Sequence, residues 1–546
     1  MSKRISRSTF LKGISGLVLA AAAGKLCFDT YKRNAAIESR LLGPSMARGH
    51  RLRDGKTAFR SDTSPVEETE VAIVGGGIAG LSAGWWLQRN HLDDFRVLEL
   101  EPHVGGNSAS GKNSVSAYPW GAHYVPLANE ESEYVHILFK ELGVVESADK
   151  GSGLPVYNDL YLCHAPQERL FKDGRFEEGL VPKRGLKPRD ENQLADFFNL
   201  IKRYRAATGA DGRPAFAIPL ALSSADEQFR SLDRISMAQW MQDNGFDSRP
   251  LLWYVNYCCR DDYGSTLENV SAWAGIHYFS GRRGRAANAE MNSVVTWPEG
   301  NGFLVEQLRR RLQGKITTGA MVTAVEESDD RLLLTCADAD GGAPKVVSAR
   351  CVVFAAPRFI ASHVLKVEGA GRHFVPELVY SPWLVANLTL SRFPEKGLTT
   401  LAWDNVSYTS DSLGYVVATH QDITTRPAAT VLTYYYPLSA GDPGDARRQL
   451  AATSAERWTE SIVADLEKMH PGIAAYIRSI DVWPWGHGMI RPSVGFIWGD
   501  SRARMQESLG NIFFAHSDMS GISNFEESQY HGVEAARKVL DCLREA

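Results

Sequence analysis

The sequence predicts an α/β protein in which a dinucleotide-binding domain is interleaved with a second domain of mixed sheet and helices. Three observations carry this prediction. A strand-like apolar run at residues 70–74 leads directly into a glycine-rich turn at residues 75–80. A second strand-like run follows at residues 95–100, as in a strand–helix–strand unit. The chain has 546 residues, more than one hydrophobic core usually supports, so at least two domains are expected.

The composition is that of an ordinary globular protein. Hydrophobic residues make up 44% of the chain, charged residues make up 23%, and the formal net charge is -4. A nucleic-acid-binding protein would carry a basic excess. The cysteines form no CxxC pair and no His/Cys spacing suited to zinc. We therefore expect neither nucleic acid nor a metal ion among the partners of this chain.

The glycine-rich turn reads GGGIAG and stands where a strand gives way to a helix. In a Rossmann-type unit, Gly75 permits the tight turn, Gly77 lets the backbone approach a pyrophosphate, and Gly80 lets the helix pack on the strand. The amides of Ile78 and Ala79, at the start of the helix, face the phosphates. The turn is therefore predicted to bind a dinucleotide.

An acid and a second glycine pair narrow the choice of dinucleotide. Glu99 stands about twenty residues beyond the glycines, where a carboxylate accepts hydrogen bonds from a ribose. Gly105 and Gly106 follow it at a spacing that resembles the FAD-binding families and that NAD-only dehydrogenases lack. No second GxGxxG follows for a pyridine nucleotide. The sequence therefore predicts FAD as the cofactor.

Three further motifs extend this pattern along the chain. Residues 511–518 (NIFFAHSD) resemble the strand and loop that contact the FAD ribityl chain in the flavin-containing amine oxidase superfamily, which includes monoamine oxidase, protoporphyrinogen oxidase and phytoene desaturase. Residues 521–536 are similar to the closing helix of that superfamily, and residues 297–302 (WPEGNG) to a third motif. The resemblance covers nearly the whole chain after residue 70.

This resemblance implies an FAD-binding domain of the glutathione-reductase type and adds cofactor contacts. Asp518 occupies the acidic position of the ribityl loop, the amides around Phe525 face the flavin pyrimidine, and Val322 supplies a backbone contact beside the adenine. Two residues depart from the pattern of the family. Asn107 stands where many relatives have arginine, and His516 replaces a glycine of the ribityl loop. The histidine leaves open whether the FAD is covalently held.

The order of the motifs divides the chain into seven segments. An export signal (1–28) and a linker with at most one helix (29–68) come first. The FAD-binding domain is expected at 69–130, 286–370 and 486–546, with a hairpin turn at 340–342, and the substrate domain at 131–285 and 371–485.

The N-terminus carries the pattern of an export signal. Basic side chains up to Lys12 precede an apolar stretch at residues 14–23 that is too short for an ordinary membrane-spanning helix. Around Arg7 the sequence SRSTFLK is similar to the twin-arginine motif, with Ser8 in place of the second arginine. We therefore expect a periplasmic or otherwise exported protein that engages the export machinery. An uncleaved signal that anchors the chain to the membrane is the alternative.

Aromatic and imidazole side chains near the cofactor segments are candidates for the chemistry. His123 lies in the run YPWGAHY, and Trp485 and His487 lie in the run WPWGHGMIRP, where relatives cross between the two domains. An imidazole in such a place can carry a proton, and an indole can flank a substrate. Packing at the domain interface is the alternative role for each of them.

A fourth candidate is implied by the position of Pro357. Many amine oxidases hold a water on the flavin with a lysine several residues beyond the corresponding proline. Here His363 stands nearest to that place, and Lys366 follows it. The resemblance therefore places His363 near the flavin and Lys366 at the surface.

Asp261 and Asp262 follow an aromatic stretch and could pair with a cationic amine inside a pocket. The alternative is that they cap the next element or pair with Arg260.

The family resemblance implies an FAD-dependent oxidoreductase in which a C–H hydride passes to flavin N5. A small-molecule amine is the favoured substrate, and oxygen, a quinone or a redox protein is the electron acceptor. Two alternatives stay open, because a fold does not fix a function. One is a desaturase-like or protoporphyrinogen-oxidase-like enzyme for an extended apolar substrate. The other is a flavin-binding redox or assembly protein without turnover.

Overall fold

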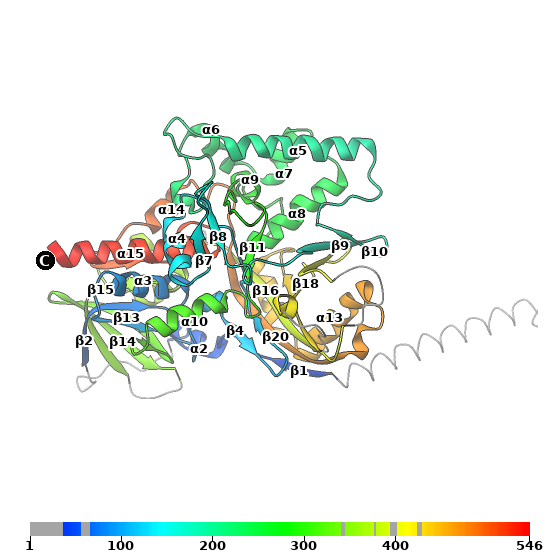
Figure 1. The fold of residues 1–546 in the computed structure, drawn as a ribbon. Helices are drawn as coiled ribbons and strands as arrows, with labels where there is room; N and C mark the ends of the chain where they lie inside the picture. The colour runs from blue at the N-terminus through cyan, green and yellow to red at the C-terminus, as the bar shows by residue number, and fades with distance from the viewer. Residues whose placement is uncertain are drawn as a thin grey trace, which may run out of the picture.

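The computed structural model describes residues 37–55, 66–339, 344–375, 378–393, 401–422 and 429–545 (Figure 1). The predicted export signal and the predicted hairpin turn at 340–342 lie outside these residues. Within the described ranges, no helix combines the length and the apolar character needed to cross a membrane.

A seven-stranded sheet forms the core of the dinucleotide-binding domain. Its apolar strands are buried on both faces, as expected for a mainly parallel sheet. The strand order is β12, β3, β2, β15, β14, β13, and β21 pairs with the end of β15. The strands are β2 (Val66–Val74), β3 (Phe95–Leu98), β12 (Ile316–Thr317), β13 (Ala320–Ser328), β14 (Arg331–Asp338), β15 (Lys345–Phe354) and β21 (Ile512–Phe514).

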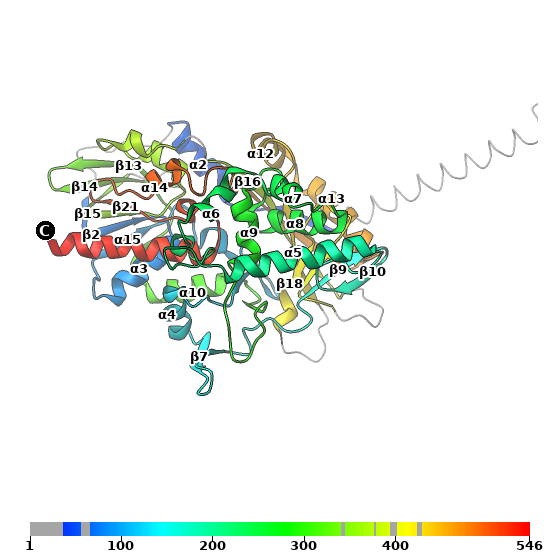
Figure 2. The same cartoon turned by 90° about the horizontal axis from the view of Figure 1, so that it is seen from above.

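Three helices pack beside one another against this sheet: α3 (Ile78–Arg89), α10 (Gly302–Arg311) and α15 (Phe525–Glu545) (Figure 2). Helix α15 approaches α3 closely because Gly532 has no side chain, and a Cβ there would lie 2.2 Å from the carbonyl oxygen of Ala79. The C-terminal helix is thereby held against the helix that follows the glycine-rich turn.

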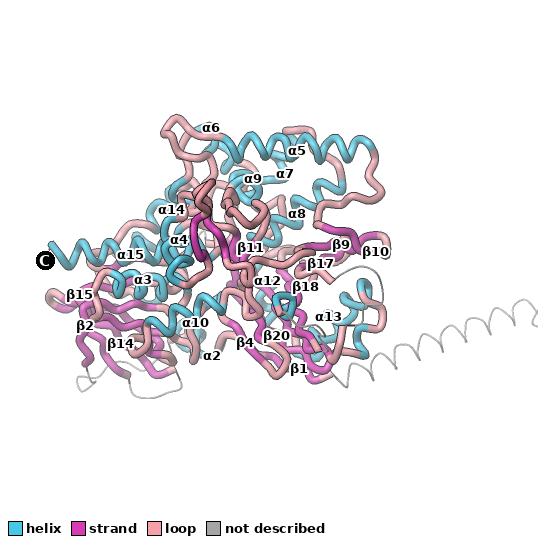
Figure 3. Tube along the Cα trace, in the orientation of Figure 1, coloured by secondary structure: helices cyan, strands magenta, loops and turns pink. Residues whose placement is uncertain are grey.

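An eight-stranded mixed sheet forms the core of the second domain, in the order β1, β20, β16, β19, β18, β17, β9, β10. Helices cover it on both sides (Figure 3). The strands are β1 (Glu38–Leu41), β9 (Glu168–Lys172), β10 (Arg175–Glu178), β16 (Tyr380–Leu390), β17 (Asp404–Ser407), β18 (Tyr415–Val417), β19 (Thr430–Pro437) and β20 (Ile477–Ile490). The main helices are α5 (Pro188–Ala206), α7 (Met237–Asp243), α8 (Arg249–Tyr263), α9 (Ala272–Ser280), α12 (Pro443–Ala452) and α13 (Ala455–Met469).

Among the described residues, three short strand pairs and a further helix lie outside the two large sheets. They are β4 (Ser110–Lys112) with β5 (Ala117–Pro119), β6 (Tyr124–Pro126) with β11 (Val294–Thr296), β7 (Val145–Ala148) with β8 (Pro155–Tyr157), and α11 (Arg358–Val364).

The two domains share one buried core. A single cluster of buried side chains contains Phe354 and Phe514 from the first sheet together with Trp383 and Trp403 from the second domain. The predicted α/β fold of two interleaved domains is confirmed. Because the chain crosses between the sheets several times, pockets are expected where the domains meet.

The segment predicted to be a linker is more ordered than its composition indicated. Besides one helix, α2 (Met46–Arg53), it contains strand β1, which pairs in parallel with β20. The linker was expected to contain at most one helix, so strand β1 was not predicted. Strand β1 is mostly exposed and owes its conformation to its partner strand, so its sequence has no apolar period that would predict a strand.

Candidate active site

The glycine-rich turn has the geometry of a dinucleotide site. Gly75 adopts a φ of 105°, and a Cβ on Gly80 would lie 1.9 Å from the carbonyl oxygen of Gly75. A Cβ on Gly77, by contrast, would meet no atom within 4 Å. Helix α3 begins directly after Gly77. Its first amides therefore face open space that a pyrophosphate can enter.

The predicted ribose acid lies beside this turn. The Gly76 N–H donates to Glu99 Oε2 at 2.7 Å, and the Glu101 N–H donates to Glu99 Oε1 at 2.8 Å. Burial raises the pKa of Glu99. The second glycine pair joins the same cluster, because the Gly105 N–H donates to the Gly76 carbonyl at 2.8 Å. Together with Gly106, which has a φ of 54°, these residues lie in the loops at one end of the sheet.

The remaining predicted cofactor contacts lie on neighbouring elements. Val322 is buried on the edge strand β13, Phe525 begins α15, and Asp518 is buried in the loop between β21 and α15. Asp518 accepts hydrogen bonds from the Tyr380 hydroxyl at 2.6 Å and the Arg358 amide at 2.9 Å. Burial opposes its ionisation, but a nearby imidazole and these donors lower its pKa on balance. Asp518 therefore carries a negative charge.

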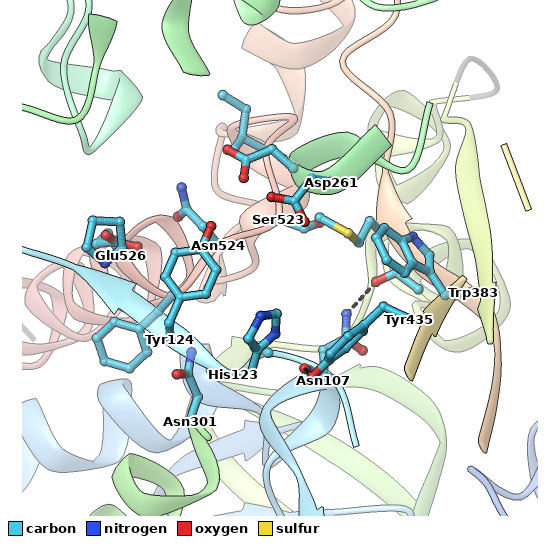
Figure 4. Close-up of a pocket in the computed structure, with 18 of the residues that line it drawn as sticks. Asn107, His123, Tyr124, Asp261, Asn301, Trp383, Tyr435, Ser523, Asn524 and Glu526 are labelled. Carbon is cyan, nitrogen blue, oxygen red and sulfur yellow. Dashed lines mark hydrogen bonds between the residues drawn. The ribbon is translucent and has the colours of Figure 1, made fainter. Parts of the chain in front are cut away.

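A cavity that is partly open to solvent lies where the two domains meet (Figure 4). Asn107 and Phe525 reach it from the dinucleotide side, and Asn107 donates its side-chain amide to the Gly488 carbonyl. Helices α8 and α9 and strands β16, β19 and β20 provide the other walls. Cofactor candidates and substrate-domain side chains thus border one space.

His123 lies in this cavity among aromatic rings. Its imidazole stacks on Tyr435 with a centroid separation of 4.5 Å, and the Trp403 ring lies 5.3 Å away. Burial lowers the pKa of His123 to about 4, so the ring is neutral at pH 7. Trp485 lines the same cavity and donates its indole N–H to the Trp120 carbonyl at 2.6 Å. The structure therefore brings these two predicted residues together.

His487 lies outside the cavity, although it is close to Trp485 in sequence. Its ring stacks on Phe359 at 4.7 Å and is accessible to solvent. The protein packed around it, together with the cations Arg447 and His50, lowers its pKa to about 4. The register of β20 against β16 is irregular between Trp485 and Met489. Trp485 and His487 therefore have different neighbours although they are two residues apart, and only Trp485 reaches the cavity.

His363 lies on the surface of the molecule. It lies in the last turn of α11, whose buried side chains are Arg358, Ala361 and Val364. The face that carries His363 is exposed, and the residue does not line the cavity. Its place near the flavin stays a prediction. Lys366 is exposed, as expected.

The two adjacent acids of α8 face into the cavity. Asp262 forms an ion pair with Arg282 at 2.7 Å, and the same guanidinium donates to the Tyr124 hydroxyl at 3.0 Å. Burial, reinforced by Asp262, raises the pKa of Asp261 to about 7. Arg260, the partner considered from the sequence, donates instead to Ser439 and to a backbone carbonyl.

Sequence reasoning missed several residues of the cavity, among them Arg282, Glu526 and Asn301. Arg282 is remote in sequence from its partner Asp262, and no motif marks it. Glu526 lines the cavity at the start of α15, and burial raises its pKa to about 7. Asn301 belongs to the WPEGNG motif, which could have indicated it. Its Oδ1 atom is buried without a hydrogen-bond partner among the described residues, so it can accept a hydrogen bond from a ligand.

Comparisons with known proteins agree with this geometry. The family model described as flavin containing amine oxidoreductase matches residues 78–540. Putrescine oxidase bound to putrescine has a TM-score of 0.62 at 15% identity, and it aligns over 87% of this chain and 100% of its own. A protein assigned as a protoporphyrinogen oxidase, from Exiguobacterium sp. 255-15, has a TM-score of 0.59 at 16% identity, with coverage of 87% and 99%. These two likenesses concern the fold.

One curated protein, the mitochondrial L-2-hydroxyglutarate dehydrogenase of Nematostella vectensis, is 30% identical over 177 residues. The match covers 30% of this chain and 36% of that protein. The chain thus spans only about a third of the length of this curated relative.

The residues of the turn fit the FAD that this family uses. Gly77 leaves space for the pyrophosphate. Glu99 is the acid predicted for the ribose, and Asp518 is the acid predicted for the ribityl chain. The Asn301 Oδ1 atom can accept a further hydrogen bond.

We predict opposite outcomes for two glycine substitutions in this turn. Gly77→Ala should leave the fold intact, because its Cβ meets no protein atom, but should weaken FAD binding about tenfold or more by filling the approach to the pyrophosphate. Gly80→Ala should destabilise the apoprotein by about 1–3 kcal/mol, since its Cβ would overlap the Gly75 carbonyl. Thermal unfolding of the apoprotein and titration with FAD measure both. Unchanged FAD affinity in Gly77→Ala would contradict the assignment.

Proposed function

We propose that this chain, an FAD-dependent oxidoreductase that belongs to the family of flavin-containing amine oxidoreductases, takes a cationic amine as its substrate. The observation that carries the proposal is the charge of the cavity. Three carboxyl groups, those of Asp261, Asp262 and Glu526, line it together with the single guanidinium of Arg282. A positively charged ligand balances such a site.

The ion pairing inside the cavity also favours a cationic substrate. Asp262 is already paired with Arg282, whereas Asp261 and Glu526 have no ion-pair partner among the described residues. Both unpaired groups are buried enough that their pKa values rise to about 7. An apolar substrate would leave these carboxyl groups desolvated without compensation, which is costly. An ammonium group would instead pair with them, and this difference favours an amine over an extended apolar substrate.

The aromatic wall supports the same substrate. His123 and Tyr435 stack on one side of the cavity, and the Tyr435 hydroxyl is held by the Gly121 carbonyl at 2.9 Å. Tyr124 and Trp383 extend the wall. Such rings pack against the carbon chain of an amine, exclude water, and attract the cation through their faces.

In the proposed reaction, bound FAD supplies the two-electron acceptor for a hydride from the C–H bond next to nitrogen. Asp261 binds the ammonium group and takes its proton, since its pKa of about 7 suits both tasks. The lone pair that remains on nitrogen then forms the C=N bond as the hydride leaves. The N-terminal amides of α15, which begins at Phe525, favour negative charge beside the cavity during this step. Water hydrolyses the released iminium to a carbonyl compound.

Reduction of the flavin without oxygen tests the substrate class. Putrescine, a cationic amine, should bleach the visible flavin band of the purified holoprotein, and a neutral polyene should not. Bleaching by the polyene alone would move the assignment to a desaturase-like enzyme. Failure of every donor would indicate a flavin-binding protein without turnover. Admission of oxygen, or of a quinone, after bleaching then identifies the acceptor by the rate at which colour returns.

The pH dependence tests the role of Asp261. Because burial and Asp262 raise its pKa to about 7, the group is neutral at lower pH and its attraction for an ammonium ion is lost as the pH falls through that value. We expect kcat/KM for putrescine to rise between about pH 6 and pH 8. Asp261→Asn should lower it about tenfold or more at pH 8 and flatten the rise. The exposed Glu268→Gln serves as control. Titration of the amine itself is common to all variants and cancels in the ratio to wild type, so a ratio independent of pH would contradict this role.

We also propose that the protein is exported by the twin-arginine route, which suits a protein that folds around its cofactor before transport. The basic residues and the short apolar stretch of the N-terminus support this proposal. Arg7→Lys should leave precursor in the cytoplasm, as fractionation and immunoblotting would show. Unaltered processing would contradict it.

A further inference from the structure

We infer that helix α2, which precedes the stretch matched by the family model, forms part of the FAD site: its cationic side chains cover the ADP half of the cofactor and help to retain it. The inference rests on the placement of FAD along Gly77, Glu99 and Asp518 proposed above.

The first turn of α2 is attached beside the predicted ribose acid. The Ser45 N–H donates to Glu101 Oε1 at 2.7 Å, and the Arg48 guanidinium lies 3.6 Å from Glu101 Oε2. Glu101 in turn donates its N–H to the Glu99 carboxylate. Arg48 therefore contacts Glu101, which is hydrogen-bonded to Glu99, the acid assigned to the ribose. The Arg48 side chain is mostly buried there.

The second turn of α2 follows the adenine side of the site. Arg51 donates to the Ala339 carbonyl at 3.0 Å, at the end of β14. The Ala339 N–H donates to the Gly319 carbonyl, and the Gly319 N–H donates to the Glu101 carbonyl. These backbone contacts connect Arg51 to the turn that leads into β13, the strand of the predicted adenine contact.

The same helix also reaches toward the flavin side. His50 lies near enough to His487 to contribute to its lowered pKa, after burial and Arg447. The His487 ring is 5.8 Å from that of Tyr380, whose hydroxyl donates to the predicted ribityl acid, Asp518. Helix α2 therefore extends from the ribose end of the cofactor toward its ribityl end. The pyrophosphate of FAD lies between those two ends.

The chemical character of α2 fits an anion rather than a core. A surface helix usually turns an apolar stripe inward, but α2 has no fully buried residue, and the partly buried Arg48 and Arg51 are on its inner side. The helix carries no acidic residue. On the opposite side of the site, the residue after the second glycine pair is the neutral Asn107, which is held by Gly488. Arg48 shares its charge with Glu101, whereas Arg51 donates to a neutral carbonyl and so brings net positive charge to this side of the site.

Helix α2 is held in place from the substrate domain. Strand β1, just before it, pairs with β20, and Arg40 binds the Asp481 carboxylate through two hydrogen bonds of 2.6 and 2.8 Å. Figures 1 and 2 show α2 beside the nucleotide-binding sheet, and Figure 1 shows β1 beside the other sheet. Because its supports lie on both domains, α2 is positioned before the cofactor arrives, which reduces the entropy lost on binding.

The test is FAD affinity in variants of the two inward-facing arginines. Arg48→Gln with Arg51→Gln should weaken binding of FAD to the apoprotein about tenfold or more and speed flavin loss from the holoprotein on dialysis. Arg53→Gln is the matched control, since Arg53 lies on the same helix, is exposed, and pairs with its neighbour Asp54. Equal affinity in the double variant and wild type, or an equal loss in the control, would overturn the inference.

Two further titrations separate phosphate binding from a general loss of structure. ADP should bind the double variant more weakly, by a factor similar to that for FAD, and riboflavin, which has no phosphate, should bind it as it binds wild type. Equal weakening for riboflavin would overturn the inference. Arg48→Gln combined with Glu101→Gln should still bind FAD weakly; restored affinity would show that Arg48 only neutralises Glu101. None of these readouts uses a substrate, so a failure of the amine assignment would be distinguishable.

Discussion

The close approach of three backbones determines the geometry on which the site depends. Strand β2, helix α3 and helix α15 meet where Gly80 faces the Gly75 carbonyl and Gly532 faces the Ala79 carbonyl. A side chain at Gly80 would force α3 away from the turn that follows β2, and one at Gly532 would force α15 away from α3. Because glycine stands there, the first amides of α3 point along the end of the sheet, and α15 runs beside α3 with its own N-terminus at the cavity.

The position of α15 also links the cofactor domain to the substrate domain. Glu527, in its first turn, is fully buried and accepts the Leu220 N–H at 2.6 Å. Leu220 belongs to the substrate domain, so the helix terminus that borders the cavity is tied to both halves of the fold. The neighbouring Glu526 lines the cavity itself. Helix α15 therefore contributes both backbone amides and a carboxyl group to the proposed site.

Burial gives the acids of the cavity their selectivity. A carboxyl group in water gains little from meeting an ammonium ion, but one removed from water either stays protonated or pairs with a cation. Arg282 satisfies Asp262, and Asp261 and Glu526 stay close to the balance between the two states. The same principle operates in the proposal for the other end of the cofactor, where the cationic side chains of α2 lie beside the predicted ribose acid.

The sequence by itself determined the parts of this protein that depend on local spacing. The turn from Gly75 to Gly80, the acid at Glu99 and the acid at Asp518 could be read from their order, because short segments of fixed geometry place these residues whatever else the chain does. The FAD cofactor and the interleaved α/β fold followed from them.

Tertiary structure alone decided which distant side chains meet. It paired Asp262 with Arg282, stacked His123 on Tyr435, and left His363 on the surface. It also made a strand of residues 38–41, which lack an apolar period and acquire their conformation from β20. Such contacts depend on how segments from both domains pack against one another, and no local pattern records that packing. The cofactor could therefore be predicted from the sequence, whereas the charge of the proposed substrate cavity is determined by the folded structure.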